Sequence, residues 1–187
     1  IDEAEVLEAY KNEVRSKAAT AMTAEDMEYI EEDLRSPCTQ EIAVFRAFAE
    51  IVDKAENEIV VIDTAPTGHT LLLLDATESY HKEVQRTHGD TPASVRKLLP
   101  RLRNQQETEV VIVTLPEATP VFEAERLQKD LQRAGIHNKW WVVNACLSLT
   151  DTANAFLRAK AQNELGWIKK VEALSKGNAA LIAWKNK

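Results

Sequence analysis

The first third of the chain has apolar residues at three- and four-residue steps, the spacing of amphipathic helices. Residues 3–20 and 24–34 are predicted to form two such helices, rich in Ala, Glu and Lys. Thr23 is a suitable N-cap for the second. A third helix is predicted to begin at Ser36-Pro37, because Ser is favoured as an N-cap and Pro at the first helical position. Its inward positions are Ile42, Phe45, Phe48 or Ala49, and Val52.

Three short apolar runs alternate with helical segments in the rest of the chain. The runs are residues 58–62, 109–114 and 140–144, and each is predicted to be a buried strand. The predicted helices are one that contains Leu71 to Leu74, and residues 93–105, 119–134 and 151–174. The helix 119–134 should direct Val121, Ala124, Leu127 and Leu131 inward and end at Gly135. Residues 179–184 are either a short strand or a fraying end.

Strands that alternate with helices predict βαβ units, and therefore an α/β fold with a parallel sheet flanked by helices. The length of 187 residues and the hydrophobic content of 44% suit one domain with a substantial core. We expect residues 1–187 to form a single domain, with a helical region at 1–35 and an α/β core at 36–187. No internal repeat or low-complexity linker divides the sequence.

The net charge of −7 is concentrated near the start of the sequence. Residues 1–35 hold 11 acidic and 4 basic side chains, while residues 36–187 hold 19 of each. This distribution argues against nucleic acid as a partner. The two cysteines, Cys38 and Cys146, have neither zinc-site spacing nor a disulfide pattern, so we expect a reducing, cytoplasmic location. No apolar stretch approaches the roughly 20 residues of a membrane span.

The segment Asp63 to Thr70 joins the first predicted strand to a helix. Asp63 would lie at the carboxyl end of the strand, where α/β sheets bind ligands, and its carboxylate suits Mg²⁺. Thr67 can cap the following helix, and Gly68 frees the backbone. The amides near Gly68 and His69 would then face the ligand edge and form an anion site. A plain strand end followed by an ordinary capped helix is the alternative.

The octet D-T-A-P-T-G-H-T resembles the signature of the arsenical pump-driving ATPases and of related ATPases that target tail-anchored membrane proteins. Residues 31–45, 113–121 and 134–137 also resemble the C-terminal half of that family. The resemblance implies a P-loop NTPase fold of the deviant Walker, nucleotide-switch type, with ATP and Mg²⁺. It places Asp63 at Mg²⁺ and the attacking water and Gly68 at the γ-phosphate, with Thr67 among the nucleotide-binding residues. Asn144 matches an asparagine that bonds adenine, although a strand-end Asn is equally common in turns.

Cys38 is the second residue of the helix that begins at Ser36-Pro37. Its position at the positive helix end favours the thiolate, which suits soft ions. By the same resemblance, Cys38 matches a cysteine that binds arsenite or antimonite, with Ser36 and His69 around that site. A small buried side chain is the other interpretation. The remaining ligands would come from the other nucleotide-binding half or from a second copy, and Cys146 is expected to serve packing.

The five glycines allow no G-x-x-x-x-G-K-[ST] phosphate-binding loop. Because that loop supplies much of the positioning and charge in phosphoryl transfer, we expect this chain alone to be inactive. We therefore interpret it as a fragment of an arsenite- or antimonite-stimulated ATPase that drives an integral membrane arsenite pump. Binding to this pump would hold the ATPase at the membrane surface. The alternatives are a tail-anchored protein targeting ATPase and a non-catalytic interaction module. The zinc-binding C-x-x-C of that targeting family is absent here.

In ATPases of this class, the strand before the phosphate-binding loop lies between the strands that correspond to residues 59–62 and 110–113. Without it, two rows of backbone groups would be unpaired. The chain can close the gap by pairing these two segments directly, or it can associate with another copy. We expect direct pairing, because both segments are short and apolar on both faces.

Overall fold

The structure, a computed structural model, describes residues 2–19, 23–63 and 92–185. These residues divide into two compact units. The first contains the helices up to residue 63 and most of α5, whereas the second contains residues 102–185 and the sheet. The prediction of a single domain over 1–187 stays a prediction. None of the described helices is long and apolar enough to cross a membrane.

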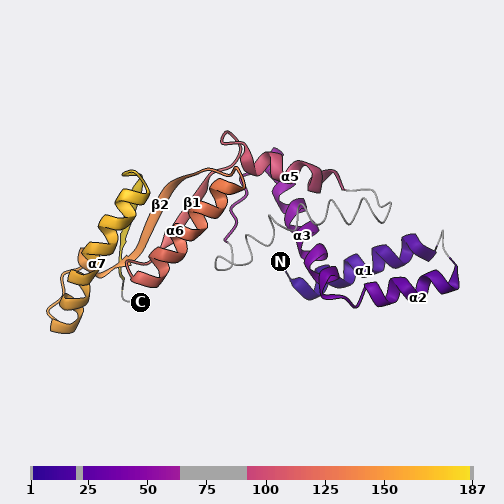
Figure 1. The fold of residues 1–187 in the computed structure, drawn as a ribbon, viewed down its shortest axis with the longest axis horizontal. Helices are drawn as coiled ribbons and strands as arrows, with labels where there is room; N and C mark the ends of the chain where they lie inside the picture. Colours follow the sequence, from indigo (N-terminus) through magenta and orange to yellow (C-terminus); the bar gives the residue numbers. More distant parts are fainter. Residues whose placement is uncertain (1, 20–22, 64–91, 186–187) are drawn as a thin grey trace. The chain divides into compact units, whose positions relative to one another are not determined.

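The first unit begins with two helices that lie side by side, α1 (Glu3–Ala19) and α2 (Ala24–Asp33) (Figure 1). The Arg15 guanidinium binds both carboxylate oxygens of Glu31, at 2.6 and 3.0 Å, and so joins α1 to α2. Thr23 caps α2 as predicted: its side chain accepts a hydrogen bond from the Asp26 backbone N–H. In turn, the Asp26 carboxylate accepts a hydrogen bond from the Thr23 backbone N–H. This reciprocal pair is a capping box, which satisfies donors that a helix start leaves free.

Helix α3 (Pro37–Asp53) begins after the N-cap Ser36, as the sequence predicts. Its buried positions include Phe45, Ala49 and Val52. The Arg46 guanidinium links α3 to α1, since it lies 3.0 Å from the Glu13 carboxylate. A short 3₁₀ turn, η1 (Lys54–Glu56), follows α3.

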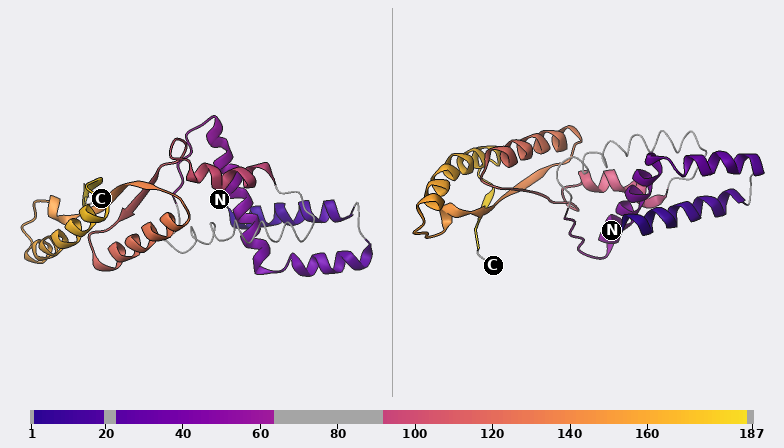
Figure 2. Two further views of the ribbon diagram at one scale, coloured as in Figure 1. Left: turned by 45° about the horizontal axis from the view of Figure 1, so that its top comes forward. Right: turned by 90° about the horizontal axis from the view of Figure 1, so that it is seen from below.

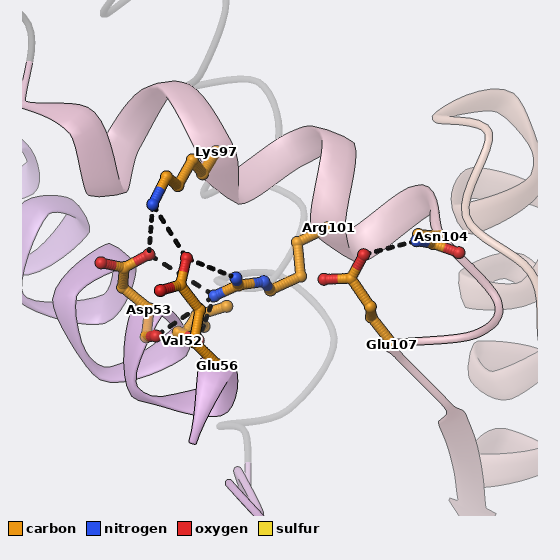
Figure 3. A network of polar contacts seen from close by, with 7 residues as sticks. All are labelled: Val52, Asp53, Glu56, Lys97, Arg101, Asn104 and Glu107. Atoms are coloured by element: carbon orange, nitrogen blue, oxygen red, sulfur yellow. Dashed lines mark hydrogen bonds and ion pairs between the residues drawn. The ribbon is translucent and has the colours of Figure 1, made fainter. Parts of the chain in front are cut away.

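Helix α5 (Ala93–Arg103) is tied to the end of α3 by charged side chains (Figure 3). Arg101 is only 9% exposed, and its Nη1 donates to the carbonyl oxygens of Val52 and Asp53, at 3.0 and 3.3 Å. Its Nη2 donates to Glu56 at 3.1 Å, and Lys97 lies 2.8 Å from the same carboxylate. Because the last carbonyls of a helix have no partner within the helix, Arg101 completes the C-terminal end of α3.

The described part of the second unit is a parallel sheet with the strand order β1-β2-β3. The strands are β1 (Val110–Thr114), β2 (Asn138–Cys146) and β3 (Ala179–Ala183). Helix α6 (Ala118–Arg133) connects β1 to β2, and α7 (Ala155–Leu174) connects β2 to β3 after a short 3₁₀ turn, η2 (Leu147–Leu149). Both helices lie on the same face of the sheet (Figure 2). The predicted α/β fold and βαβ unit are confirmed, and residues 179–183 form a strand.

The core of the second unit lies between the sheet and these two helices. Val121, Ala124 and Leu131 of α6 are buried as predicted, whereas Leu127 is half-buried. Ile112 of β1 and Trp141 and Val143 of β2 complete this core. Helix α6 ends at Gly135, whose φ of +74° is a left-handed conformation that Gly adopts without steric cost.

The predicted buried strand at residues 58–62 is wrong. These residues form no strand, and the side chains of Ile59 and Val61 are 95% and 88% exposed. A strand requires a neighbour for its backbone groups, and β2 is the neighbour of β1 among the described residues. The expected pairing of 59–62 with 110–113 would join the two units, and it stays a prediction.

Among the described residues, strand β1 lies at the edge of the sheet, and it is buried on one face. Its side chains Val111 and Val113 are 45% and 61% exposed, while Ile112 is buried. The sequence predicted burial on both faces, but in the described part of this unit the helices cover a single face of the sheet. Within the described residues of this unit, the apolar side chains of the other face have no covering element.

Candidate functional site

The three parallel strands of the second unit end at one edge of the sheet, and a pocket of about 330 Å³ lies there. The segment after β1 contributes Leu115, Pro116 and Glu117, while the end of β2 contributes Ala145 and the turn η2 contributes Leu147. Helix α7 contributes Phe156, Leu157, Lys160 and Glu164, and Trp184 follows β3. The Trp184 amide donates to the carbonyl oxygen of Cys146 at 3.0 Å, which fixes the end of β3 beside the end of β2.

The side chains that line this carboxyl-edge pocket are largely apolar, and several of them are exposed to solvent. Phe156 is 75% exposed, and Leu115 and Trp184 are 40% and 42% exposed. Leu147 is buried and forms part of the floor. Flat apolar walls at the carboxyl edge of a parallel sheet suit a planar ring such as a nucleotide base.

Three charged side chains give the pocket its polar groups. Lys160 Nζ lies 2.9 Å from the Glu117 carboxylate, and this hydrogen bond raises the pKa of Lys160. Glu164 is 2% exposed, and its Oε2 accepts a hydrogen bond from the Ser148 amide at 2.9 Å. Burial raises the pKa of the neighbouring Cys146 thiol, and the charge of Glu164 adds to that rise.

Asn144 lies near the end of β2, as the sequence predicts, although the strand continues to Cys146. Its side chain is exposed, and Oδ1 accepts a hydrogen bond from the Ala145 amide at 2.9 Å. Ala145 lines the pocket and has a φ of +55°, so the backbone turns sharply beside Asn144. Asn144 is thus the sequence neighbour of a pocket-lining residue and is not itself part of the lining.

The first unit holds Ser36, Cys38 and Asp63, three of the residues predicted to bind metalloid or Mg²⁺. Ser36 Oγ accepts a hydrogen bond from the Cys38 amide at 3.1 Å, and the Cys38 side chain is exposed. The alternative interpretation of Cys38 as a buried packing residue is therefore wrong, whereas Cys146 is buried as expected. Asp63 is exposed and does not end a strand, contrary to prediction.

Thr67, Gly68 and His69 lie outside the described residues. The proximity of His69 to Ser36 and Cys38, and the roles assigned to all of these residues, therefore stay predictions. In the described ranges, no group of three or more His, Cys, Asp and Glu side chains could hold a metal ion.

Sequence reasoning did not single out Lys160 or Glu164. The signal was present, because Phe156, Leu157, Lys160 and Glu164 recur at three- and four-residue steps on one face of α7. A polar residue on such a face is usually taken as its solvated border, so a buried carboxylate there is visible only once α7 is packed.

A parallel βαβαβ sheet with a pocket at its carboxyl edge defines an α/β protein of the nucleotide-binding type. The sequence model of the anion-transporting ATPase family matches residues 1–92 and 86–179. The chain belongs to this family, and its parallel sheet flanked by helices is a part of the P-loop NTPase fold.

The chain is also similar to individual members. It is 45% identical over 182 residues to the arsenical pump-driving ATPase of Escherichia coli, covering 97% of this chain and 31% of that protein. The arsenical pump-driving ATPase of Acidiphilium multivorum is 45% identical over 175 residues, covering 94% of this chain and 30% of that protein. A more distant relative, the ATPase GET3C of Arabidopsis thaliana, is 27% identical over 179 residues, covering 75% of this chain and 45% of that protein. The chain thus spans about a third of the length of the arsenical pump-driving relatives.

Proposed function

We propose that the chain is part of an arsenite- or antimonite-stimulated ATPase and that the carboxyl-edge pocket receives the adenine base of ATP. The pocket carries this proposal, because it combines apolar walls with the end of a parallel strand that bears Asn144. Its volume of about 330 Å³ lies at the lower end of the range for small-molecule sites, which suits a base better than a whole nucleotide.

Within the pocket, Leu115, Leu147, Phe156 and Trp184 remove the ring from water. Asn144 supplies a hydrogen bond to the edge of the base, since its amide has donor capacity beyond the Oδ1 contact with Ala145. Thr67 and Gly68 would bind the phosphates. The Asp63 carboxylate is exposed and is an oxygen ligand of the kind Mg²⁺ prefers, so it fits that ion. Bound Mg²⁺ would neutralise charge on the phosphates.

The metalloid site would use the exposed thiol of Cys38, with Ser36 and His69 beside it. A soft thiolate fits arsenite or antimonite, but one thiolate leaves further coordination positions open. The other ligands are therefore assigned to the other nucleotide-binding half or to a second copy. The complete ATPase would couple ATP hydrolysis to metalloid efflux through an integral membrane pump and would act in the cytoplasm at the membrane.

A tail-anchored protein targeting ATPase is the second candidate. The similarity to ATPase GET3C supports it, but at 27% identity against 45% for the arsenical pump-driving ATPases. The higher identity over a larger share of the chain favours the metalloid function.

Equilibrium binding of ATP to the purified chain, measured by calorimetry, tests the proposed base site. We expect adenosine to compete with ATP and tripolyphosphate not to compete. Asn144→Ala should weaken ATP binding roughly tenfold, the effect of one lost hydrogen bond in a desolvated site. Asn163→Ala, an exposed asparagine of α7, is the matched control and should have no effect. Competition by tripolyphosphate alone would place the nucleotide elsewhere.

A further inference from the structure

Glu164 is a buried carboxylate that the proposed chemistry does not use. It lies in the middle of α7, is 2% exposed and lines the carboxyl-edge pocket. An ionised carboxylate is costly to bury unless hydrogen bonds or counter-charges compensate it. Its Oε2 accepts from the Ser148 backbone N–H at 2.9 Å.

The nearest basic side chain before Glu164 on α7 forms its ion pair with another carboxylate. Lys160 is one turn before Glu164 on α7, but its Nζ pairs with Glu117 at 2.9 Å. In the described part of the chain, the hydrogen bond recorded for Glu164 is the one from Ser148. The carboxylate is thus committed to a backbone group rather than to an ion pair.

Ser148 belongs to η2, the turn that carries Leu147 into the pocket. Leu147 is 6% exposed, and its carbonyl oxygen accepts from the backbone N and side-chain Oγ1 of Thr150, at 2.9 and 2.7 Å. The first N–H groups of a helical turn have no partner within the turn, so the Ser148 N–H depends on an outside acceptor. Glu164 is that acceptor, and it fixes η2 to α7.

The geometry points to Glu164 as a positioning residue of the base pocket. Through its hydrogen bond to Ser148, it holds the turn Leu147–Leu149 in the position where Leu147 lines the pocket and can contact the bound ring. Glu164 acts through Ser148 and need not touch the ligand. This inference rests on the proposed function, because it assigns the pocket to a nucleotide base. Without the carboxylate, the part-buried Ser148 N–H loses its acceptor, and the turn can move away from the ligand.

Three variants separate this role from general stability. Glu164→Ala removes the acceptor, whereas Glu164→Gln removes the charge but keeps an oxygen that can accept from Ser148. Ser148→Ala is the matched control, because it removes only the side-chain hydroxyl, whose oxygen is buried without a partner among the described residues. Unfolding monitored by Trp fluorescence checks that each variant folds.

Amide hydrogen exchange of residue 148 and calorimetric ATP binding are the two measurements. In Glu164→Ala, we expect this amide to exchange at least about tenfold faster and ATP to bind roughly tenfold more weakly, as for one lost hydrogen bond. Glu164→Gln and Ser148→Ala should keep values close to those of the parent chain. Affinity for tripolyphosphate should not change in any variant.

Unchanged exchange in Glu164→Ala would overturn the inference, as would lost protection with unchanged ATP affinity. Failure of Glu164→Gln to restore ATP binding would also overturn it, because charge rather than positioning would then matter. If the parent chain binds no ATP, the proposed function fails and this inference fails with it. The exchange of the Ser148 amide would still report whether Glu164 holds the turn.

Discussion

Arg101 donates a hydrogen bond from Nη1 to the backbone carbonyl oxygen of Val52, 3.0 Å away, and so closes the end of α3 with a side chain from α5. Arg101 also forms ion pairs with the carboxylates of Asp53 and Glu56. Lys97 pairs with the same two carboxylates, but its side chain is half exposed. The two cations therefore share these carboxylates, but Arg101 is more buried and also donates to the backbone carbonyl oxygens of Val52 and Asp53.

Replacing Arg101 by Ala should lower the free energy of unfolding of the first unit by about 2 kcal/mol, because buried carbonyl groups lose their donor. Lys97→Ala should cost at most about 1 kcal/mol, as for an exposed ion pair. Far-UV circular dichroism in urea measures the effect. The four tryptophans, all between residues 140 and 184, serve as an internal control on the second unit. Equal effects of the two substitutions would contradict this account.

Glu125 should make the stability of the second unit depend on pH in acid. The hydrogen bond from Lys170, and then that from Lys129, lowers the pKa of Glu125 from 4.5 to about 2. A folded-state pKa below the unfolded value contributes stability above the unfolded pKa, and this is lost as pH falls from about 4.5 toward 2. Glu125→Gln should weaken the pH dependence of the urea unfolding midpoint over that range. Trp fluorescence measures this midpoint. If Glu125→Gln leaves the pH dependence of the urea midpoint unchanged, Glu125 is not its source. The same holds if the exposed control Glu123→Gln weakens this dependence equally.

The two thiols should differ in reactivity and in metalloid binding. Cys38 is exposed and Cys146 is buried, so a thiol reagent should label one site rapidly in the native chain. Antimonite should protect that site weakly, because one thiolate gives an exchangeable complex. Cys38→Ser should abolish rapid labelling, and Cys146→Ser should leave both labelling and protection unchanged. Equal protection in Cys38→Ser and the parent would place the metalloid elsewhere.

The isolated chain should not hydrolyse ATP, even if it binds the base. No phosphate-binding loop can be drawn through its glycines, and phosphoryl transfer depends on the groups of that loop. A steady-state phosphate-release assay on the purified chain measures this. Turnover above background that disappears in Asp63→Ala would show that the chain is catalytically sufficient.

The amides of Val60 to Ile62 should exchange rapidly with solvent. These residues belong to no strand, while Trp141 to Val143 lie in the central strand β2 and should be strongly protected. Hydrogen exchange followed by NMR compares the two segments. Protection of residues 60–62 that increases with protein concentration would instead indicate strand pairing with a second copy, as exposed apolar edges permit.

Local rules in the sequence predicted the elements whose ends have their own chemical signals. Ser36-Pro37 and Thr23 mark helix starts through capping, and Gly135 ends α6 through its positive φ. The βαβ unit followed from two apolar runs separated by one amphipathic helix. The octet that begins at Asp63 and the other matching segments indicated the family to which the chain belongs. These features involve neighbours in sequence, so residue order alone is sufficient to predict them.

Only the tertiary structure decided which apolar and charged residues are buried. Residues 58–62 have the composition of a strand, but a strand exists only beside another strand, and that requirement is not encoded locally. The pocket joins Leu115, Leu147, Lys160 and Trp184, which come from separate elements and meet because the strands run parallel. Arg101 and Glu164 lie on helices as ordinary charged residues and become buried because α3 and η2 each leave a backbone group unpaired. Burial of a charge depends on that distant partner, which the chain acquires only by folding.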